Sequence, residues 1–216
     1  VTRILAGIVF SLGLILVIVG GAELFTGNNL MVMAWAGGKV SLGEVLRAWG
    51  LVYIGNFAGA AATAVLVFLT DHYGHGAGAV GAAALAAAQA KAVLAFLPAL
   101  VHGILGNVLV CLAVWLCYSA RTTTDKILAI VPPVSAFVAA GFEHSVANMY
   151  TLPFALLIKD WAPGSFWTSI GQSPATYDDL TWLSLAANLV PVTIGNVIGG
   201  GVLVGAVYWF VYLRRR

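Results

Sequence analysis

The sequence predicts an all-α protein embedded in a membrane as a single domain, residues 1–216. Composition is the first reason: 61% of the 216 residues are hydrophobic and only 8% are charged, whereas soluble domains carry about 25% charged residues. The second reason is that five apolar runs are each long enough to cross a bilayer. The third is a weak internal repeat, which predicts that the buried polar residues meet near the middle of the membrane.

The five apolar runs define the expected spans. A helix needs about 20 residues to cross about 30 Å of hydrocarbon. Of the five, the fourth is longer than one helix needs and contains Glu143, His144 and Asn148. We expect it to be a broken helix, because irregular backbone at this depth is tolerated only where it contacts protein or lines a cavity. The runs occupy residues 4–22, 51–69, 93–118, 127–158 and 183–213.

Positive charges are distributed unevenly between the two sides of the membrane. With alternate connections assigned to opposite sides, seven Lys and Arg residues fall on one side and three on the other. Because positive residues favour the cytoplasmic side, we expect the connections 37–47 and 119–126 and the C-terminus in the cytoplasm. The seven are Lys39, Arg47, Arg121, Lys126, Arg214, Arg215 and Arg216, and the three are Arg3, Lys91 and Lys159.

The composition also argues against several partners and cofactors. A net charge of +2 is too small to indicate a nucleic-acid partner. Cys111 and Cys117 lie inside one apolar run without a metal pattern or a disulfide framework, so we expect packed or lipid-facing side chains. His72 and His75 form a pair without further ligands, which is a weak metal signal. We expect no metal and no cofactor.

Two short motifs recur in the two halves of the chain. The first is Gly-x-Glu with Asn five residues after the Glu, at residues 21–28 and 141–148. The second is Ile-Gly-Asn-x-x-Gly, at residues 54–59 and 194–199. The repeat therefore covers both halves, although the packing of helices alone would also favour the glycines of the second motif as small contact residues.

The repeat is inverted, because the segments that enter the two Gly-x-Glu motifs cross the membrane in opposite directions. We assign residues 1–70 to the end of the first repeat, which is a broken helix and the helix after it, and residues 93–213 to the second repeat. In inverted-repeat transport proteins the interruptions of corresponding helices meet near the midplane. A pathway is therefore expected between residues 23–28 and residues 143–148.

The segment Gly-Phe-Glu-His-Ser-Val-Ala-Asn-Met at residues 141–149 closely resembles the signature of the formate/nitrite transporter family. The stretch 148–154 and the long connection 160–181 are more similar to the formate channel branch. The start of the stretch 26–29, Thr-Gly, recurs in nitrite-type members, which keeps nitrite and hydrosulfide as alternatives. Other segments similar to the family are residues 10–16, 22–26, 107–115 and 191–201.

The resemblance implies an aquaporin-like protomer with an inverted repeat of three plus three helices, of which the second and fifth are broken. The first of these helices is expected to be missing from this chain, which begins with Val next to an apolar run. It further implies a homo-pentamer with one pore per protomer in a lipid bilayer, the bacterial inner (cytoplasmic) membrane. Trp161, Trp167 and Trp182 are expected at the outer boundary of that membrane.

His144 is the first candidate site residue, because an ionisable group at membrane depth is costly and is a functional hypothesis by default. A bare carboxylate entering a dry constriction pays several kcal/mol even after relaxation. An imidazole, whose charge changes near neutral pH, offers partial neutralisation or a proton. By resemblance, His144 is the central pore histidine and lies opposite Thr26.

Two further groups of pore residues follow from the resemblance. Lys91 matches a lysine of the outer vestibule, where a cation would raise the local anion concentration. A second set matches apolar constrictions on either side of the histidine, which would strip water from the ion, although an aromatic side chain in a span usually serves packing. This set is Phe10, Leu14, Leu24, Phe25 and Phe137.

The remaining polar residues of the spans are expected to support the helix breaks. Backbone groups freed by a break need partners in a membrane, and two free carboxylates would not suit an anion pathway. We therefore expect a structural role for Glu23, Asn28, Asn107, Glu143 and Asn148.

The expected function is a channel or transporter for small monovalent anions, with formate first. A membrane enzyme is disfavoured, because the chain has no H-E-x-x-H motif and every Asp lies in or beside a connection. Ser145 beside His144 is not a dyad, since neighbours on a helix point apart. A neutral-solute pore of the aquaporin kind would show repeated Asn-Pro-Ala, which the chain lacks.

Overall fold

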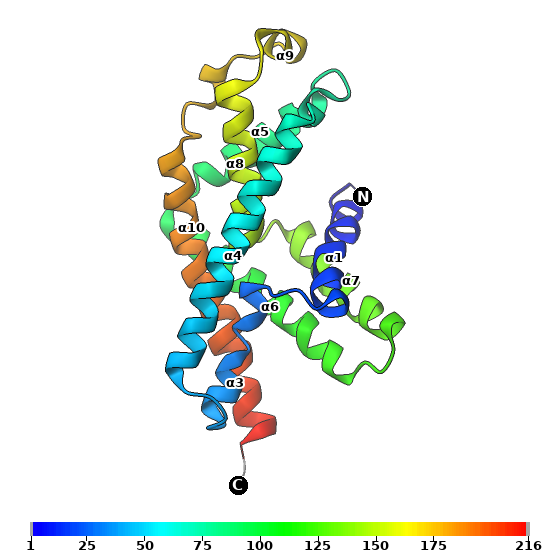
Figure 1. The fold of residues 1–216 in the computed structure, drawn as a ribbon, viewed down its shortest axis with the longest axis vertical. Helices are drawn as coiled ribbons and strands as arrows, with labels where there is room; N and C mark the ends of the chain where they lie inside the picture. Colours follow the sequence, from blue (N-terminus) through cyan, green and yellow to red (C-terminus); the bar gives the residue numbers. More distant parts are fainter. Residues whose placement is uncertain (1, 215–216) are drawn as a thin grey trace.

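The computed structural model describes residues 2–214, and no β-strand occurs in that range. Figure 1 shows an elongated bundle with the C-terminus at one end and α9 at the other. Arg215 and Arg216, two of the charges counted above, lie outside the described residues. The α-helices are α1 (Thr2–Gly20), α2 (Phe25–Asn28), α3 (Met31–Ala36), α4 (Leu42–Leu69), α5 (Ala79–Ala92), α6 (Phe96–Ser119), α7 (Thr123–Ala140), α8 (Ser145–Trp161), α9 (Gly164–Ile170) and α10 (Trp182–Val197). The 3-10 turns are η1 (His72–Gly74) and η2 (Pro174–Tyr177), and the π-helical segments η3 (Ile198–Ala206) and η4 (Trp209–Leu213) continue from α10.

Five segments of the described chain are long and apolar enough to cross a membrane. Their outward faces carry large apolar side chains such as Val9 and Leu183, which are 73% and 78% exposed. Soluble proteins rarely expose large contiguous apolar patches, so the chain is a multi-pass membrane protein. The five segments are Thr2–Gly20, Leu42–Leu69, Phe96–Ser119, Thr123–Ala140 and Pro174–Leu213.

The fourth predicted span is broken, as its polar residues indicate. α7 ends at Ala140, and α8 begins only at Ser145. Gly141 ends α7 in the left-handed conformation with φ 73°, which a glycine adopts without steric cost. The chain then runs through extended backbone at His144, the N-cap of α8.

The first span is broken in a similar way. α1 ends at Gly20, and residues 21–24 connect it to the short helices α2 and α3. Gly21 has φ 78°, close to the value of Gly141 at the second break. α1 packs along α7, so the two breaks lie in one region of the molecule (Figure 1).

Several helix boundaries differ from the apolar runs. α4 begins at Leu42 rather than near residue 51, because Ser41 and Glu44 form a capping box at its start. The apolar runs do not predict α5, which has 14 residues, mostly alanine and glycine, and is too short to cross a bilayer. A short gap at residues 93–95 separates it from α6.

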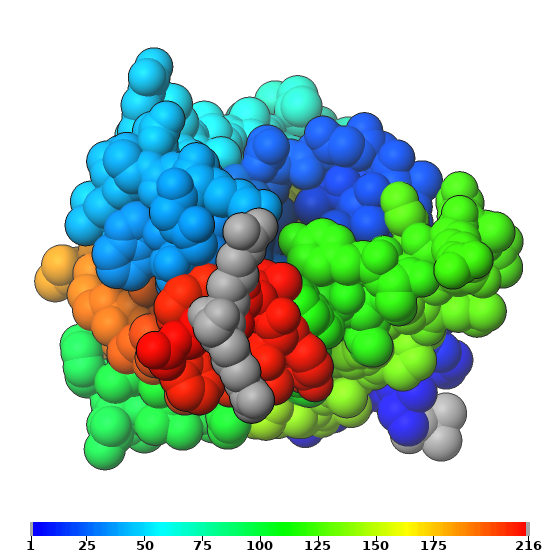
Figure 2. All heavy atoms as spheres, turned by 90° about the horizontal axis from the view of Figure 1, so that it is seen from below, coloured from blue at the N-terminus to red at the C-terminus, as the bar shows by residue number. Residues whose placement is uncertain are grey.

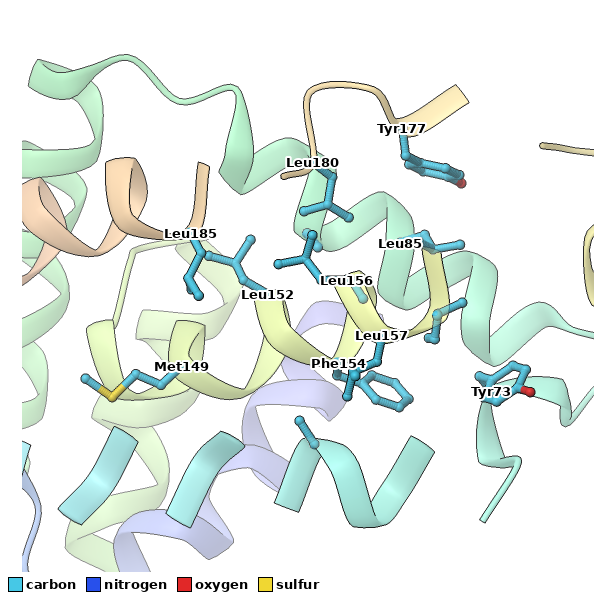
Figure 3. Close-up of a cluster of buried hydrophobic side chains, with 14 of the residues drawn as sticks. Tyr73, Leu85, Met149, Leu152, Phe154, Leu156, Leu157, Tyr177, Leu180 and Leu185 are labelled. Carbon is cyan, nitrogen blue, oxygen red and sulfur yellow. The ribbon is translucent and has the colours of Figure 1, made fainter. Parts of the chain in front are cut away.

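The long connection at residues 160–181 is folded and packs over one end of the bundle. It contains α9 and η2, and its Trp167 joins a buried apolar cluster with Tyr73 and Tyr177 (Figure 3). Burial raises the pKa of the Tyr73 phenol, and the Asp71 carboxylate that accepts its hydrogen bond adds to this effect. Trp161 and Trp182 are exposed, as expected of an aromatic boundary, but Trp167 is only 7% exposed. Trp167 thus packs inside the protein, and its depth relative to the membrane stays a prediction.

Glycines allow α6 and α10 to cross very closely. A β-carbon on Gly195 or Gly199 would overlap main-chain atoms of α6, so these two positions require glycine for packing, in line with small residues at membrane helix contacts. Gly59, the counterpart of Gly199 in the sequence repeat, has no atom within 4 Å of the position where its β-carbon would lie. Within one protomer, the packing explanation thus fits the second copy of the motif but not the first.

Candidate functional site

The two helix breaks meet at a hydrogen bond between Thr26 and His144. Thr26 Oγ1 lies 2.8 Å from His144 Nε2, although the two residues are far apart in the sequence. Both side chains are buried, with exposed fractions of 0% for Thr26 and 6% for His144. The pair lies where the repeat predicts, between the interruption of one half and the interruption of the other.

The other ring nitrogen of His144 determines how the proton is placed. His144 Nδ1 accepts the backbone N–H of Ala147 at 3.1 Å and so caps α8. A nitrogen that accepts carries no proton, so in the neutral ring Nε2 carries it and donates to Thr26 Oγ1. The Thr26 hydroxyl proton then remains available for another acceptor. The N-terminus of α8 adds positive potential at this point.

A small cavity of about 170 Å³ lies beside His144. Its walls are apolar apart from the imidazole, and Phe137 stands between the rings of Phe10 and His144, with a centroid distance of 6.0 Å to each. Four of the five predicted constriction residues line this cavity. Its lining residues are Phe10, Gly13, Leu14, Val17, Leu24, Val110, Val134, Phe137, His144, Val146 and Ala147.

Phe25, the fifth predicted constriction residue, is not among the lining residues of the cavity. Its ring packs edge-on against Trp49 and Tyr53, at centroid distances of 6.2 Å and 4.9 Å. Because Phe25 is next to Thr26 in the chain, the sequence alone does not show whether its side chain faces the cavity or α4. The structure assigns Phe25 to packing.

A wide hollow of about 1040 Å³ opens at the C-terminal end of the molecule. Gly27 and Asn28 line it, directly after Thr26 in the chain, while Leu24 lines the small cavity. Along the chain, Thr26 thus lies between a residue that lines the small cavity and residues that line the hollow. Lys39 and Arg214 also line the hollow, and Figure 2 views this end, with the α3 region in light blue beside the C-terminal helix in red.

Two asparagines hold the backbone of the breaks in the same way. Asn196 Oδ1 accepts the N–H of Ser145 at 2.9 Å, and Asn196 Nδ2 donates to the Glu143 carbonyl at 3.2 Å. In the first half, Asn56 accepts the N–H of Phe25 at 2.9 Å and donates to the Glu23 carbonyl at 3.0 Å. The sequence does not predict this role, although both asparagines belong to the repeated Ile-Gly-Asn motif.

The two carboxylates of the repeat share one contact but differ in environment. Glu23 accepts a hydrogen bond from Asn28 Nδ2, and Glu143 accepts one from Asn148 Nδ2. Glu143 is 4% exposed, whereas Glu23 is exposed on the surface of the protomer. Within the protomer, only Glu143 is therefore buried.

Lys91 forms an ion pair with Glu143. Lys91 Nζ lies 2.7 Å from Glu143 Oε1, and the side chains are 21% and 5% exposed. Asn188 completes the cluster, because its Nδ2 donates to the Lys91 carbonyl and its Oδ1 accepts from Asn148. Lys91 thus contacts the second break through Glu143 and does not line either cavity.

Asn107 supports the first break from α6. Its Nδ2 lies within hydrogen-bond distance of the Thr26 carbonyl at 3.2 Å and of Asn29 Oδ1 at 2.8 Å. The Cys111 thiol also donates to the Thr26 carbonyl, at 3.3 Å. The predicted structural role of Asn107 agrees with these contacts, and Cys111 is a buried packed side chain rather than a lipid-facing one.

A multi-pass helical protein in which two helix breaks meet at a buried His–Thr pair beside an apolar cavity belongs to the class of membrane channels and transporters. Residues 1–210 match the family model described as formate/nitrite transporter. The chain is 46% identical to the formate channel FocA of Escherichia coli over 98% of its own length and 75% of that protein. It is 40% identical to FocA of Haemophilus influenzae, over 94% of the chain and 72% of that protein.

Solved structures give the same assignment. The chain superimposes on a pentameric formate channel with formate bound at a TM-score of 0.92, with 45% identity over 99% of this chain and 84% of that one. An FNT family ion channel matches at a TM-score of 0.79, with 30% identity over 97% of this chain and 77% of that one. The chain belongs to the formate/nitrite transporter family.

Proposed function

We propose that the protein is a membrane channel for small monovalent anions, with formate as the principal substrate. The observation that carries this proposal is the buried Thr26–His144 pair, whose imidazole lines a small apolar cavity. In this proposal the anion passes this pair on its way between the small cavity and the wide hollow. The formate channels among the relatives support the choice of formate. Nitrite and hydrosulfide are the alternatives within the family.

The pair addresses the physical difficulty of moving a carboxylate through a greasy passage. An ion that leaves water for a dry site loses its hydration at a cost of several kcal/mol. With Nε2 donating to Thr26 Oγ1, the Thr26 hydroxyl can donate to an anion oxygen, and the N-terminus of α8 favours negative charge at the same place. Transfer of a proton to the anion, so that the acid crosses in neutral form, requires the imidazolium form of His144, in which Nδ1 is also protonated and its bond with the Ala147 N–H is lost; the ring returns to the neutral form when Nε2 or Nδ1 gives up that extra proton.

The walls of the small cavity act on hydration rather than on charge. Phe10, Leu14, Leu24 and Phe137 surround the space beside His144 with apolar surface. Such a constriction excludes hydrated ions by dewetting. Lys91 contributes indirectly in this proposal, because its charge is paired with Glu143 at the second break.

The assembly and orientation are part of the same proposal. Five copies form a pentamer in the bacterial inner membrane, each with its own pathway, and the pentameric formate channel to which the chain is similar supports this assembly. The hollow lined by Lys39 and Arg214 faces the cytoplasm, in line with the charge bias of the connections. Residues 1–70 and 93–213 are the two parts of an inverted repeat, and catalysis is not part of the function.

Flux measurements on the purified protein in liposomes test the proposal. We expect formate to enter much faster than glycerol at equal gradients. Nitrite and hydrosulfide fluxes are measured alongside, because these anions are the alternative substrates. Empty liposomes provide the background. Faster glycerol than formate flux would favour a neutral-solute pore, and a clear preference for nitrite or hydrosulfide would replace formate as the principal substrate.

A further inference from the structure

His102 is an ionisable residue inside a membrane helix, and the proposed pathway does not use it. It lies in α6 and is half-buried at the surface of the protomer. Ionisable side chains at membrane depth are costly and are usually retained for a reason. The sequence offers it no partner, but the structure does: the backbone of the second helix break.

His102 holds this break at two points. Its ring Nδ1 lies 3.1 Å from the Gly141 carbonyl oxygen, and its own carbonyl accepts the N–H of Glu143 at 3.3 Å. A carbonyl oxygen only accepts, so the ring carries a proton on Nδ1 and donates it. Between the two points, the Phe142 ring stands edge-on to the imidazole, at a centroid distance of 5.9 Å and an interplanar angle of 89°.

The Gly141 carbonyl is free to accept because α7 ends there. A backbone group without a partner is unfavourable at membrane depth. At the corresponding position of the first break, no hydrogen bond to the Gly21 carbonyl occurs within residues 2–214. The second break, which carries His144, thus has a support on its outward side that its counterpart lacks.

We infer that His102 is a positioning residue for the second helix break. By clamping Gly141 and Glu143 from the outward side, it holds the next residue, His144, at hydrogen-bond distance from Thr26. This inference rests on the proposed function in one respect, namely that His144 lines the transport pathway. The clamp itself is a property of the fold and can be tested without transport.

Amide hydrogen exchange of the full assembly in nanodiscs tests the clamp. His102→Leu removes the N–H donor of the ring and keeps a side chain of similar volume. His102→Asn keeps an N–H donor close to the position of Nδ1. Leu97→Ala is a control at an exposed site of the same helix. We expect the amides of residues 142–146 to exchange about fivefold faster in His102→Leu, as for the loss of one net hydrogen bond, and at the wild-type rate in His102→Asn and Leu97→Ala. Equal exchange in all four proteins would overturn the inference.

Formate flux through the same proteins tests the consequence for transport. We expect a reduction of about fivefold in His102→Leu and recovery in His102→Asn, since the displaced loop carries His144. Faster exchange with unchanged flux would contradict a role in positioning His144. If the wild-type protein conducts no formate, the proposed function fails, whereas the exchange pattern still decides whether the clamp exists.

Discussion

At the residue scale, the two nitrogens of His144 have different partners. Nδ1 accepts from Ala147 and caps α8, while Nε2 contacts Thr26. An imidazole that gained a proton on Nδ1 would lose the cap, so the ring is held as a donor at Nε2. This arrangement explains why a histidine, with two nitrogens at a fixed separation, suits the position.

The Lys91–Glu143 pair changes the interpretation of the lysine. The sequence indicates a vestibule cation that attracts anions, but the ion pair at 2.7 Å largely neutralises its charge. Breaking a buried ion pair costs more than the pair contributes, because the remaining charge has no partner. The pair is therefore expected to matter for the stability of the second break.

Lys91→Ala should lower the free energy of unfolding by about 3 kcal/mol. This is near the lower end of the losses measured when one partner of a buried ion pair is removed, because Lys91 remains 21% exposed. The double variant Lys91→Met with Glu143→Gln should recover most of this loss, since no unpaired charge remains. Thermal unfolding in detergent of the single and double variants measures both. Strictly additive losses would contradict direct coupling of the two side chains.

Ionic strength distinguishes a paired lysine from a steering lysine. Free surface charges act over about 8 Å at physiological salt and weaken as salt rises. Because Lys91 is paired, we expect Lys91→Ala to reduce formate uptake by a similar factor at low and high salt. A defect that disappears at high salt would instead support electrostatic steering.

At the element scale, each break depends on an asparagine from a neighbouring helix. Asn196 makes three backbone contacts, with the third to the Gly103 carbonyl at 2.8 Å, whereas Asn56 makes two. The second break is therefore the more firmly held of the two. Its asparagine also connects α6, α10 and α8.

Asn196→Leu should be the more destabilising of two matched variants. It leaves two buried backbone groups of the break, the Ser145 N–H and the Glu143 carbonyl, without partners, at about 1–3 kcal/mol each. The contacts that Asn56→Leu removes are part-buried at Phe25 and exposed at Glu23, so water can replace them in part. Thr168→Val in α9 is the control, since its hydroxyl bonds only to its own helix and should cost no more than about 0.5 kcal/mol. Unfolding in detergent ranks the three, and a loss in Asn196→Leu as small as in Thr168→Val would contradict the account.

The sequence predicts the elements that depend on hydrophobicity and repetition, and misses those that depend on contacts. The spans and the break at His144 follow from apolar runs and polar interruptions. α5 could not be predicted in this way, because its alanines carry no strong apolar signal. The repeat brought the two breaks together and the family resemblance named Thr26 and His144 as the facing pair, whereas the pairing of Lys91 with Glu143 and the orientation of Phe25 depend on the tertiary fold.

At the scale of the whole molecule, the proposed pathway runs from the hollow at the C-terminal end past the histidine to the small apolar cavity. Lys39 and Arg214 add positive charge to the wide hollow, while the lining of the small cavity has no Lys, Arg, Asp or Glu and one neutral imidazole. Anions can therefore collect at one mouth before they meet the dry region. The buried cluster that contains Tyr73 and Tyr177 lies toward the opposite end of the bundle, where α9 is found (Figures 1 and 3).

The proposed orientation can be tested by labelling with membrane-impermeant thiol reagents. Lys39→Cys should react only from the cytoplasmic side, and Ser173→Cys, in the connection beside α9, only from the outside. The native Cys111 and Cys117 are buried and should stay unlabelled in both cases. Labelling of Lys39→Cys from outside intact cells would contradict the orientation.

Formate flux into liposomes as a function of pH, measured for His144→Phe and Thr26→Val, tests the central claim that the pathway passes between these two residues. His75→Asn, which changes an exposed histidine, is the control. With correctly assembled protein in every case, we expect both pathway variants to lose most flux or to change its pH profile, and the control to behave as wild type. An unaltered rate and pH profile in both pathway variants would contradict the account.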